Sequence, residues 1–78
     1  MMGPFKTYKL MYRFGAWVTK EKYAAESDEE AIFDADQTWA GDDSLHSWPY
    51  EVALWCIEDN RIVKTYKEAN DGTYIRQQ

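Results

Sequence analysis

A single helix start constrains the fold of this chain more than any other feature. The run Ser27-Asp28-Glu29-Glu30 has the pattern of a capping box. In such a box the Ser27 hydroxyl accepts from the Glu30 N–H, and the Glu30 carboxylate reaches back to the Ser27 N–H. Downstream, apolar residues recur at helical spacing and form one stripe: Ala31, Ile32, Ala35 and Trp39. With Gly41 expected at the C′ position, the sequence predicts one helix near the middle of the chain.

The segment before this helix has the pattern of β-strands. From Phe5 to Phe14, apolar and polar residues alternate, which is typical of a strand with one buried face. Ala16 to Ala25 continues in residues that favour strands. We expect a hairpin that turns near Gly15, and the alternative is a turn at Thr19–Lys22 after a longer first strand.

The segment after the helix predicts a second hairpin. Asp42–Pro49 is expected to be a loop, and Tyr50–Glu58 is apolar on both faces, which is typical of a central strand. Asp59-Asn60 suits a two-residue turn because both residue types tolerate a positive φ, and Arg61–Glu68 would be the returning strand. Asn70-Asp71-Gly72 predicts a further turn.

These elements predict an α+β fold of order ββαββ, with one helix packed on a four-stranded antiparallel sheet. The 78 residues are expected to form one small domain, 1–78, with residues 1–4 and 73–78 loosely ordered. So short a chain has few residues from which to build a core. Here 13 of the 78 residues are Phe, Trp or Tyr, and each of these can bury about 150–250 Å².

Catalytic and metal-binding patterns are weak. Cys56 and His46 are each the single example of their type, and Cys56 lies within the expected central strand, where a thiol is normally inert. Asp42 and Asp43 with His46 make only a thin metal-ligand set, and the four glycines are too scattered for a phosphate loop. We therefore expect no enzyme activity, no catalytic residue, no metal and no cofactor.

Cysteine usage and hydropathy predict a cytoplasmic protein. One cysteine excludes an intramolecular disulfide framework and fits a reducing compartment. The longest apolar run is far shorter than the roughly 18 residues that a membrane span needs, and the first residues lack the pattern of a signal peptide. We expect no membrane partner, and the host cytoplasm as the location if the protein comes from a phage.

Charge is divided unevenly along the chain. The formal net charge is −5, with a pI near 4.7. Residues 23–60 contain eleven acids and no base, a formal charge of −11. The remaining 40 residues contain nine bases and three acids, a formal charge of +6. Such an uneven distribution of charge is evidence about the binding partners of a protein as well as about its fold.

Capping explains only part of the acidic segment. Asp28, Glu29 and Glu30 lie where the helix dipole favours negative charge, but the later acids lack the lysines at i+4 that would relieve their repulsion. A positively charged partner would relieve it, and cellular surfaces of that kind are commonly built to hold nucleic-acid phosphates. The sequence predicts a non-enzymatic inhibitor that imitates DNA on a basic nucleic-acid-binding protein. The predicted partner-binding residues are Glu26, Glu29, Asp34, Asp36, Asp42, Asp43 and Trp48.

Two other functions compete with this prediction. The basic strands with interleaved aromatic residues could bind single-stranded nucleic acid, although the low pI argues against it and their bases would equally suit solvated sheet edges. Alternatively, the two-sided apolar strand Tyr50–Glu58 and the abundant aromatic residues could serve as the interface of a homodimer or a larger homo-oligomer with a structural or accessory role.

The junction Lys22-Tyr23-Ala24-Ala25-Glu26-Ser27-Asp28-Glu29-Glu30-Ala31-Ile32 resembles one found in small phage proteins. In these proteins a strand ends in a Tyr-Ala pair and a Glu-rich helix led by Ser or Thr begins. The chain is similar in this respect to a phage inhibitor of host RNA polymerase, and in size and charge it resembles small acidic anti-CRISPR proteins. The resemblance covers residues 5–40, and the second hairpin has no counterpart in the polymerase inhibitor. It implies an inhibitor that occupies the DNA-binding surface of a nucleic-acid machine, such as a CRISPR effector.

Overall fold

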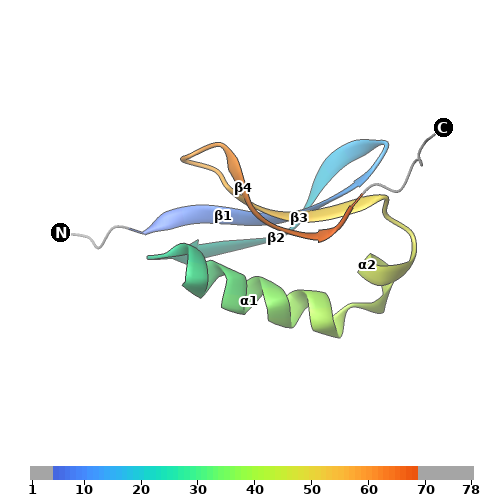
Figure 1. Ribbon diagram of the computed structural model, residues 1–78, viewed down its shortest axis with the longest axis horizontal. Helices are drawn as coiled ribbons and strands as arrows, with labels where there is room; N and C mark the ends of the chain where they lie inside the picture. The colour runs from blue at the N-terminus through green and yellow to red at the C-terminus, as the bar shows by residue number, and fades with distance from the viewer. Residues whose placement is uncertain (1–4, 69–78) are drawn as a thin grey trace.

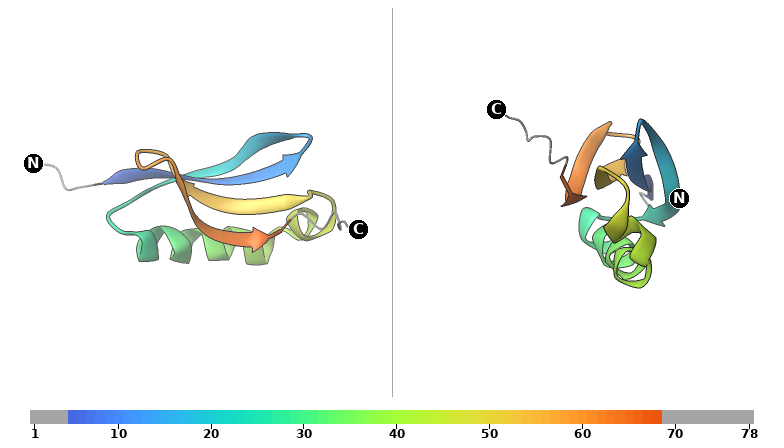
Figure 2. Two further views of the ribbon diagram at one scale, coloured as in Figure 1. Left: turned by 45° about the horizontal axis from the view of Figure 1, so that its top comes forward. Right: turned by 90° about the vertical axis from the view of Figure 1, so that its right-hand side faces the viewer.

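A computed structural model describes residues 5–68 of the chain. The expectations for residues 1–4, for the Asn70–Gly72 turn and for the tail lie outside the described residues. The described elements are β1 (Lys6–Phe14), β2 (Ala16–Ala25), α1 (Asp28–Gly41), α2 (Asp43–Ser47), β3 (Glu51–Cys56) and β4 (Arg61–Lys67). Figure 1 shows α1 lying along one face of the sheet, and Figure 2 shows both helices on that same side. The predicted α+β architecture is therefore confirmed.

The four strands form one antiparallel sheet in the order β2-β1-β3-β4. β3 is internal, as its two apolar faces predicted. Val52, Leu54 and Cys56 are buried under the helices, and Ala53 on the opposite face is only 2% exposed. The apolar character of β3 is thus satisfied within the chain.

The first hairpin turns at Gly15, where φ is +105°, a conformation that favours glycine. The alternative turn at Thr19–Lys22 is wrong, because these residues belong to β2. They do contain an irregularity. Leu10 pairs with Glu21 and Met11 pairs with Thr19, which leaves Lys20 as the extra residue of a β-bulge.

The N-terminus of α1 is capped largely as predicted. The Glu30 N–H donates to the Ser27 hydroxyl at 3.2 Å. The Glu30 carboxylate accepts from the Glu26 N–H at 2.9 Å, one residue before the predicted donor. Gly41 is the last residue of α1 instead of its C′ residue, and Asp42 forms the cap with an extended backbone. Because Asp42 ends α1 without a left-handed residue, the predicted role of Gly41 is wrong.

Two connections differ from the predictions. The segment expected to be a loop contains α2, because the Asp42 carboxylate accepts from the Ser44 N–H at 3.1 Å and starts a second short helix. The β3–β4 turn has four residues, Ile57–Asn60, instead of two. The Asn60 N–H donates to the Ile57 carbonyl at 3.2 Å, and Asn60 has the expected positive φ of 52°.

The core lies between the sheet and the helices. Tyr8 and Leu10 of β1 and the three helix-facing residues of β3 pack under Ala31 and Ala35 of α1 and Leu45 of α2. The two small alanines of α1 suit a close approach of the helix to the sheet. Ile32 and Trp39 complete the predicted stripe from partly buried positions. The core is thus one layer between a single sheet and its helical cover.

Candidate partner-binding surface

Folding brings the basic ends of the chain onto the acidic middle. Arg61 pairs with Asp28 at 2.9 Å, and Lys64 pairs with Asp36 at 3.0 Å. The other cross-segment ion pairs are Lys6–Asp59, Arg13–Glu51, Lys20–Asp42 and Arg61–Asp59. Each of them joins a base from the +6 ends to an acid from the −11 segment. The interpretation of these bases as merely solvated sheet edges is therefore wrong for five of them.

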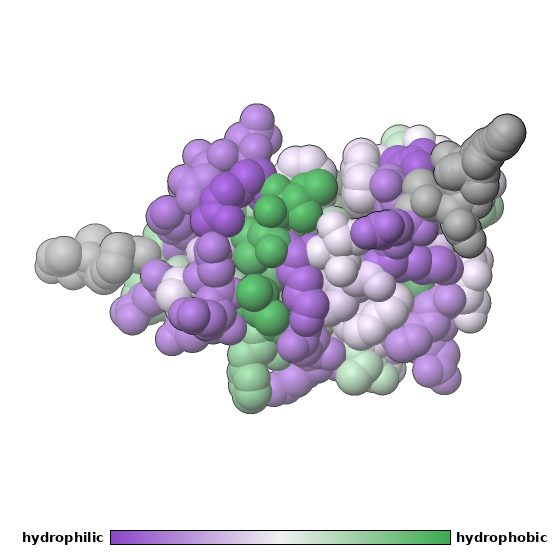
Figure 3. All heavy atoms as spheres, in the orientation of Figure 1, coloured by the Kyte–Doolittle hydropathy of each residue, from purple (hydrophilic) through white to green (hydrophobic). Residues whose placement is uncertain are grey.

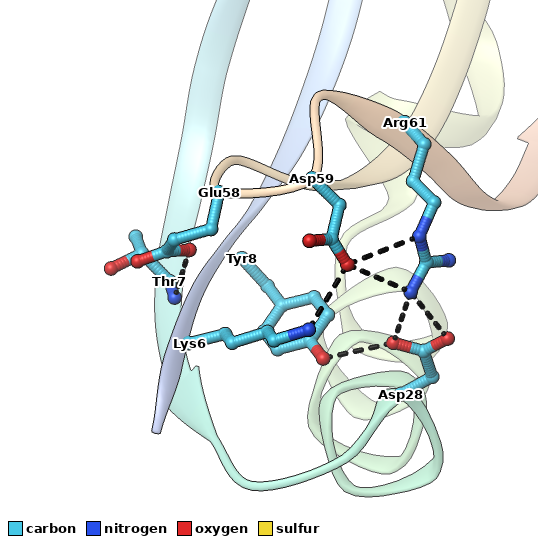
Figure 4. A network of polar contacts seen from close by, with 7 residues as sticks. All are labelled: Lys6, Thr7, Tyr8, Asp28, Glu58, Asp59 and Arg61. Carbon is cyan, nitrogen blue, oxygen red and sulfur yellow. Dashed lines mark hydrogen bonds and ion pairs between the residues drawn. The ribbon is translucent and has the colours of Figure 1, made fainter. Parts of the chain in front are cut away.

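Figure 4 shows one such network at the N-terminal end of α1. Asp28 accepts from the Tyr8 hydroxyl at 2.8 Å and from the Arg61 guanidinium. Arg61 also contacts Asp59, which accepts from Lys6 at 3.1 Å. Hydrogen bonds from Tyr8 and Arg61 lower the pKa of Asp28, and the Lys6 ammonium lowers the pKa of Asp59. These charges tie α1 to β1 and to the β3–β4 hairpin.

Asp36 and Asp42, two of the predicted partner-binding residues, are also engaged within the fold. Asp36 accepts from Tyr66 and Lys64 of β4, and the Tyr66 hydrogen bond is the main reason that its pKa is lowered. Asp42 accepts from Lys20 at 2.6 Å and from Ser44, and these contacts lower its pKa to about 2. Both carboxylates therefore contribute to holding α1 and α2 on the sheet.

Four predicted partner-binding acids are placed differently. Their side chains are exposed, and no ion pair or side-chain hydrogen bond reaches their carboxylates from residues 5–68: Glu26, Glu29, Asp34 and Asp43. Glu26 and Asp34 contribute only backbone groups to local hydrogen bonds. These four acids remain accessible to a partner.

Three of the carboxylates surround one exposed aromatic ring on α1. At 100° per residue, Phe33 projects away from the buried Ala31 and Ala35, and its side chain is 64% exposed. Glu29 and Glu30 precede it by four and three residues and share its outward side. Asp34 directly follows Phe33, about 100° further round the helix. Asp36 shares the side of Phe33 and is held by Lys64. We call Glu29, Glu30, Phe33 and Asp34 the outer face of α1. No Lys or Arg lies on α1 to offset its charge.

Trp48 lies in a different place. Its ring makes edge-on contacts with Tyr12 at 5.6 Å and Phe14 at 5.0 Å between centroids, and Phe14 stacks on Tyr50. This aromatic cluster sits beside the β1–β2 turn, after α2. Glu26 and Glu29 lie at the opposite end of α1, which is about 21 Å long. The predicted residues thus fall into two regions instead of one site.

Figure 3 shows a narrow hydrophobic band that crosses from the sheet to α1 between hydrophilic regions. Accessible apolar residues of α1 and β4 include Phe33, Ile62 and the partly buried Ile32 and Val63. Phe33 is therefore one of several apolar groups that a partner could cover next to the acidic residues.

Cys56 and His46, which were considered as catalytic or metal-binding residues, lie in different surroundings within residues 5–68. Cys56 is buried and reduced. His46, expected to be solvated in a loop, lies on α2, where its ring stacks on Trp39 with centroids 3.8 Å apart and its Nε2 lies 2.7 Å from the Trp39 carbonyl oxygen. Within residues 5–68, no three His, Cys, Asp or Glu side chains are grouped as metal ligands would be.

Sequence reasoning missed Tyr8, Lys64 and Tyr66 as partners of the acidic segment. The uneven charge distribution was the signal that could have revealed the cations, because bases confined to the ends must meet the acids once the ends fold against the middle. The tyrosine hydroxyls left no comparable pattern in the sequence.

No family model, curated protein sequence or solved structure matches the chain. Among the described residues, neither helix has the length and hydropathy required to cross a membrane. The resemblance to phage inhibitors therefore stays a prediction.

Proposed function

We propose that this protein is a non-enzymatic inhibitor that covers a basic, nucleic-acid-binding surface of another protein with the outer face of α1. The observation that carries the proposal is the combination of Glu29, Glu30 and Asp34 around the exposed Phe33, on a helix without a base. Six other acids of the −11 segment are used within the fold, five in ion pairs and Glu58 in a hydrogen bond from the Thr7 N–H. Glu26 and Asp43 are also accessible, but the outer face is where accessible carboxylates lie together with an exposed aromatic ring, although Glu30 also accepts from the Glu26 N–H.

The number of carboxylates on the outer face limits how much of a nucleic acid this surface can imitate. Over the roughly 21 Å length of α1, duplex DNA carries about twelve phosphate charges and one strand about six. The three carboxylates of the outer face lie within residues 29–34, about 7.5 Å of that length. Such a surface suits a small cluster of Lys and Arg residues better than a channel lined for a whole duplex. The outer face is therefore expected to imitate only a few phosphates of a nucleic acid.

Phe33 adds a contact that charge alone does not provide. Aromatic side chains are frequent anchors of protein interfaces, particularly where neighbouring residues exclude water from the contact. A partner that accepts Phe33 in an apolar pocket rimmed by bases would bind this protein with more specificity than a purely basic surface. Phage origin and a CRISPR effector as the target stay the finer form of the proposal.

The competing homo-oligomer prediction loses its main support. Its interface was the two-sided apolar strand together with the abundant aromatic residues. The helix-facing side of β3 and Ala53 are buried within the chain, whereas Trp55 on the opposite face is only partly buried. The aromatic cluster around Trp48 lies outside β3, and its rings contact one another while staying about half exposed. The outer face of α1 remains the better supported binding surface.

A lysate capture tests the proposal. The tagged protein, its E29K/D34K variant and an E21K/E68K control would be incubated with lysate of the bacterial host that a phage origin implies. The control makes the same charge change at exposed acids off α1, which have no ion-pair partner among residues 5–68. The wild type and control should retain a partner that E29K/D34K loses, and circular dichroism would verify all three folds.

The captured partner must also lose its nucleic acid. A labelled oligonucleotide bound to the purified partner should be displaced by the wild type and by E21K/E68K, but not by E29K/D34K. A partner that binds the protein and its oligonucleotide simultaneously would contradict the proposal.

A further inference from the structure

We infer that the sheet face opposite α1 is a second binding surface, one that takes single-stranded nucleic acid. This inference concerns a different face from the proposed inhibitor surface and does not depend on it. Neither helix covers this face (Figures 1 and 2). The alternation of side chains along a strand identifies the residues on this face. Tyr8 and Leu10 point to the helices, so their neighbours in β1 point to the opposite face.

Strand register places two lysines directly opposite each other on this face. Lys9 of β1 pairs with Lys22 of β2, and no carboxylate among residues 5–68 pairs with either. Like charges at directly opposed positions repel, and an anion between them would relieve that repulsion. Most other described bases are held by acids, so this pair is available to phosphate.

Aromatic residues continue the same row of the sheet. Lys9 pairs on its other side with Trp55 of β3, which in turn pairs with Ile62 of β4. The Trp55 ring meets the Trp17 ring edge-on, with centroids 5.9 Å apart. Register places Met11 and Ala53 between these two tryptophans, which accounts for the burial of Ala53 on a face without a helix.

Cationic and aromatic side chains in this order are what single-stranded nucleic acids require. Phosphates would lie along Lys9 and Lys22, and bases would stack on the accessible parts of the half-buried Trp17 and Trp55 rings. Arg13, paired with Glu51, lies four residues after Lys9 on β1 and on the same face. Glu58 borders the far end of β1, where it accepts from the Thr7 N–H. Among residues 5–68 the face thus has three bases, Lys9, Lys22 and Arg13, and two carboxylates, Glu51 opposite Arg13 and Glu58 at the other end.

The negative net charge argued against direct binding of nucleic acid. In the fold, however, the acids on the outer face of α1 and the lysines of this sheet face lie on opposite sides of the molecule. The outer face of α1 lies on the other side of both the sheet and the helix, about 15–20 Å from Lys9 and Lys22. At physiological ionic strength the Debye length is about 8 Å, so repulsion from those carboxylates is largely screened. The local surface, more than the net charge, then governs binding.

Fluorescence anisotropy with labelled oligothymidylate of about 12 nucleotides tests the inference. Binding should weaken with salt, and the K9Q/K22Q variant should reduce the slope of log K against log salt by about 1.4, since each phosphate contact on a single strand contributes about 0.7. A K67Q control removes one base from the helix-facing side and should leave the slope unchanged. W17A should lower the affinity about tenfold through lost stacking.

Several outcomes would overturn the inference. One is the absence of binding by the wild type at low salt, and another is an unchanged slope for K9Q/K22Q. Equal binding of polyglutamate, without a change in tryptophan fluorescence, would show that the face recognises acidic protein instead of nucleic acid. Self-association that K9Q/K22Q abolishes, without oligonucleotide binding, would assign the face to a second copy of the chain.

Discussion

Two carboxylates of α1 that are only two residues apart, Asp34 and Asp36, have different surroundings. Asp36 accepts from Lys64 and Tyr66 and binds the helix to the edge strand β4. Asp34, two residues earlier, points to solvent and has no ion-pair partner among residues 5–68. The comparison shows that the count of acids in a segment says little about function until each carboxylate has been placed.

The largest expected effect comes from comparing the loss of stability when a core residue is truncated with the loss when a residue of the outer face is truncated. L54A should destabilise the protein by about 2–5 kcal/mol, because Leu54 is fully buried in the central strand and its truncation leaves a cavity. F33A should change stability by no more than about 0.5 kcal/mol, since the ring is mostly exposed. Urea unfolding of the two variants would measure both values. A large loss for F33A would mean that the outer face is needed for folding.

Lowering the pH should reduce the stability of the folded protein, because it protonates four carboxylates that are held by ion pairs and hydrogen bonds. The pKa values of Asp28, Asp36, Asp42 and Asp59 are lowered from 3.8 in the folded protein, to about 2 for Asp42. Their stabilising contribution is present above the unfolded pKa and is lost as the pH falls through the folded values. The melting temperature should therefore decrease between about pH 4 and pH 2. A melting temperature that is constant over this range would contradict the assigned ion pairs.

Alkali should act through two tyrosines. Burial, followed by the hydrogen bond to a carboxylate, raises the pKa of both Tyr8 and Tyr66 above 10.0. The stability from these neutral hydroxyls is present below the unfolded pKa and is lost as the pH rises through the raised values. The Y66F variant removes one ionisable hydroxyl, so its melting temperature should decrease less between pH 9 and pH 12 than that of the wild type. An equal decrease would argue against the Tyr66–Asp36 contact.

The smallest predicted effect separates two neighbouring acids. D36N should lower the stability by up to about 1 kcal/mol, the upper range for an exposed ion pair, because the Lys64 ammonium loses its counter-charge. D34N should be neutral or slightly stabilising, since it removes one of several like charges on α1. Thermal melts at low salt would resolve the pair. Equal destabilisation by both variants would remove the distinction between the two carboxylates.

Much of the fold was predictable because local patterns agree with the tertiary structure. The Ser27 cap, the Gly15 turn and the two-sided apolar β3 each have a local cause that survives folding. The Gly41 and Asp59-Asn60 predictions failed because the choice between several acceptable turn geometries depends on what the flanking elements contact. The bulges of β4 also follow from contacts: Val63 and Tyr66 are the extra residues, and both pack on the core.

The binding surface was less predictable than the fold. Sequence spacing identified acids that lack a capping role, but it could not tell that Lys20 and Lys64 would reach Asp42 and Asp36. Those contacts join residues 22 and 28 positions apart, and they depend on how the sheet presents its edges to the helix. Trp48 was predicted to bind the same partner as the acids, as an exposed aromatic residue, yet its ring packs at the hairpin end.

The most direct test of the central claim is the affinity of the captured partner for three forms of this protein. At a fixed moderate salt concentration, wild type and E21K/E68K should bind equally, and E29K/D34K should bind at least about tenfold more weakly, as expected when like charges oppose each other across an interface. Isothermal titration calorimetry would give the three dissociation constants. Equal affinity of all three forms would contradict the assignment of binding to the outer face of α1.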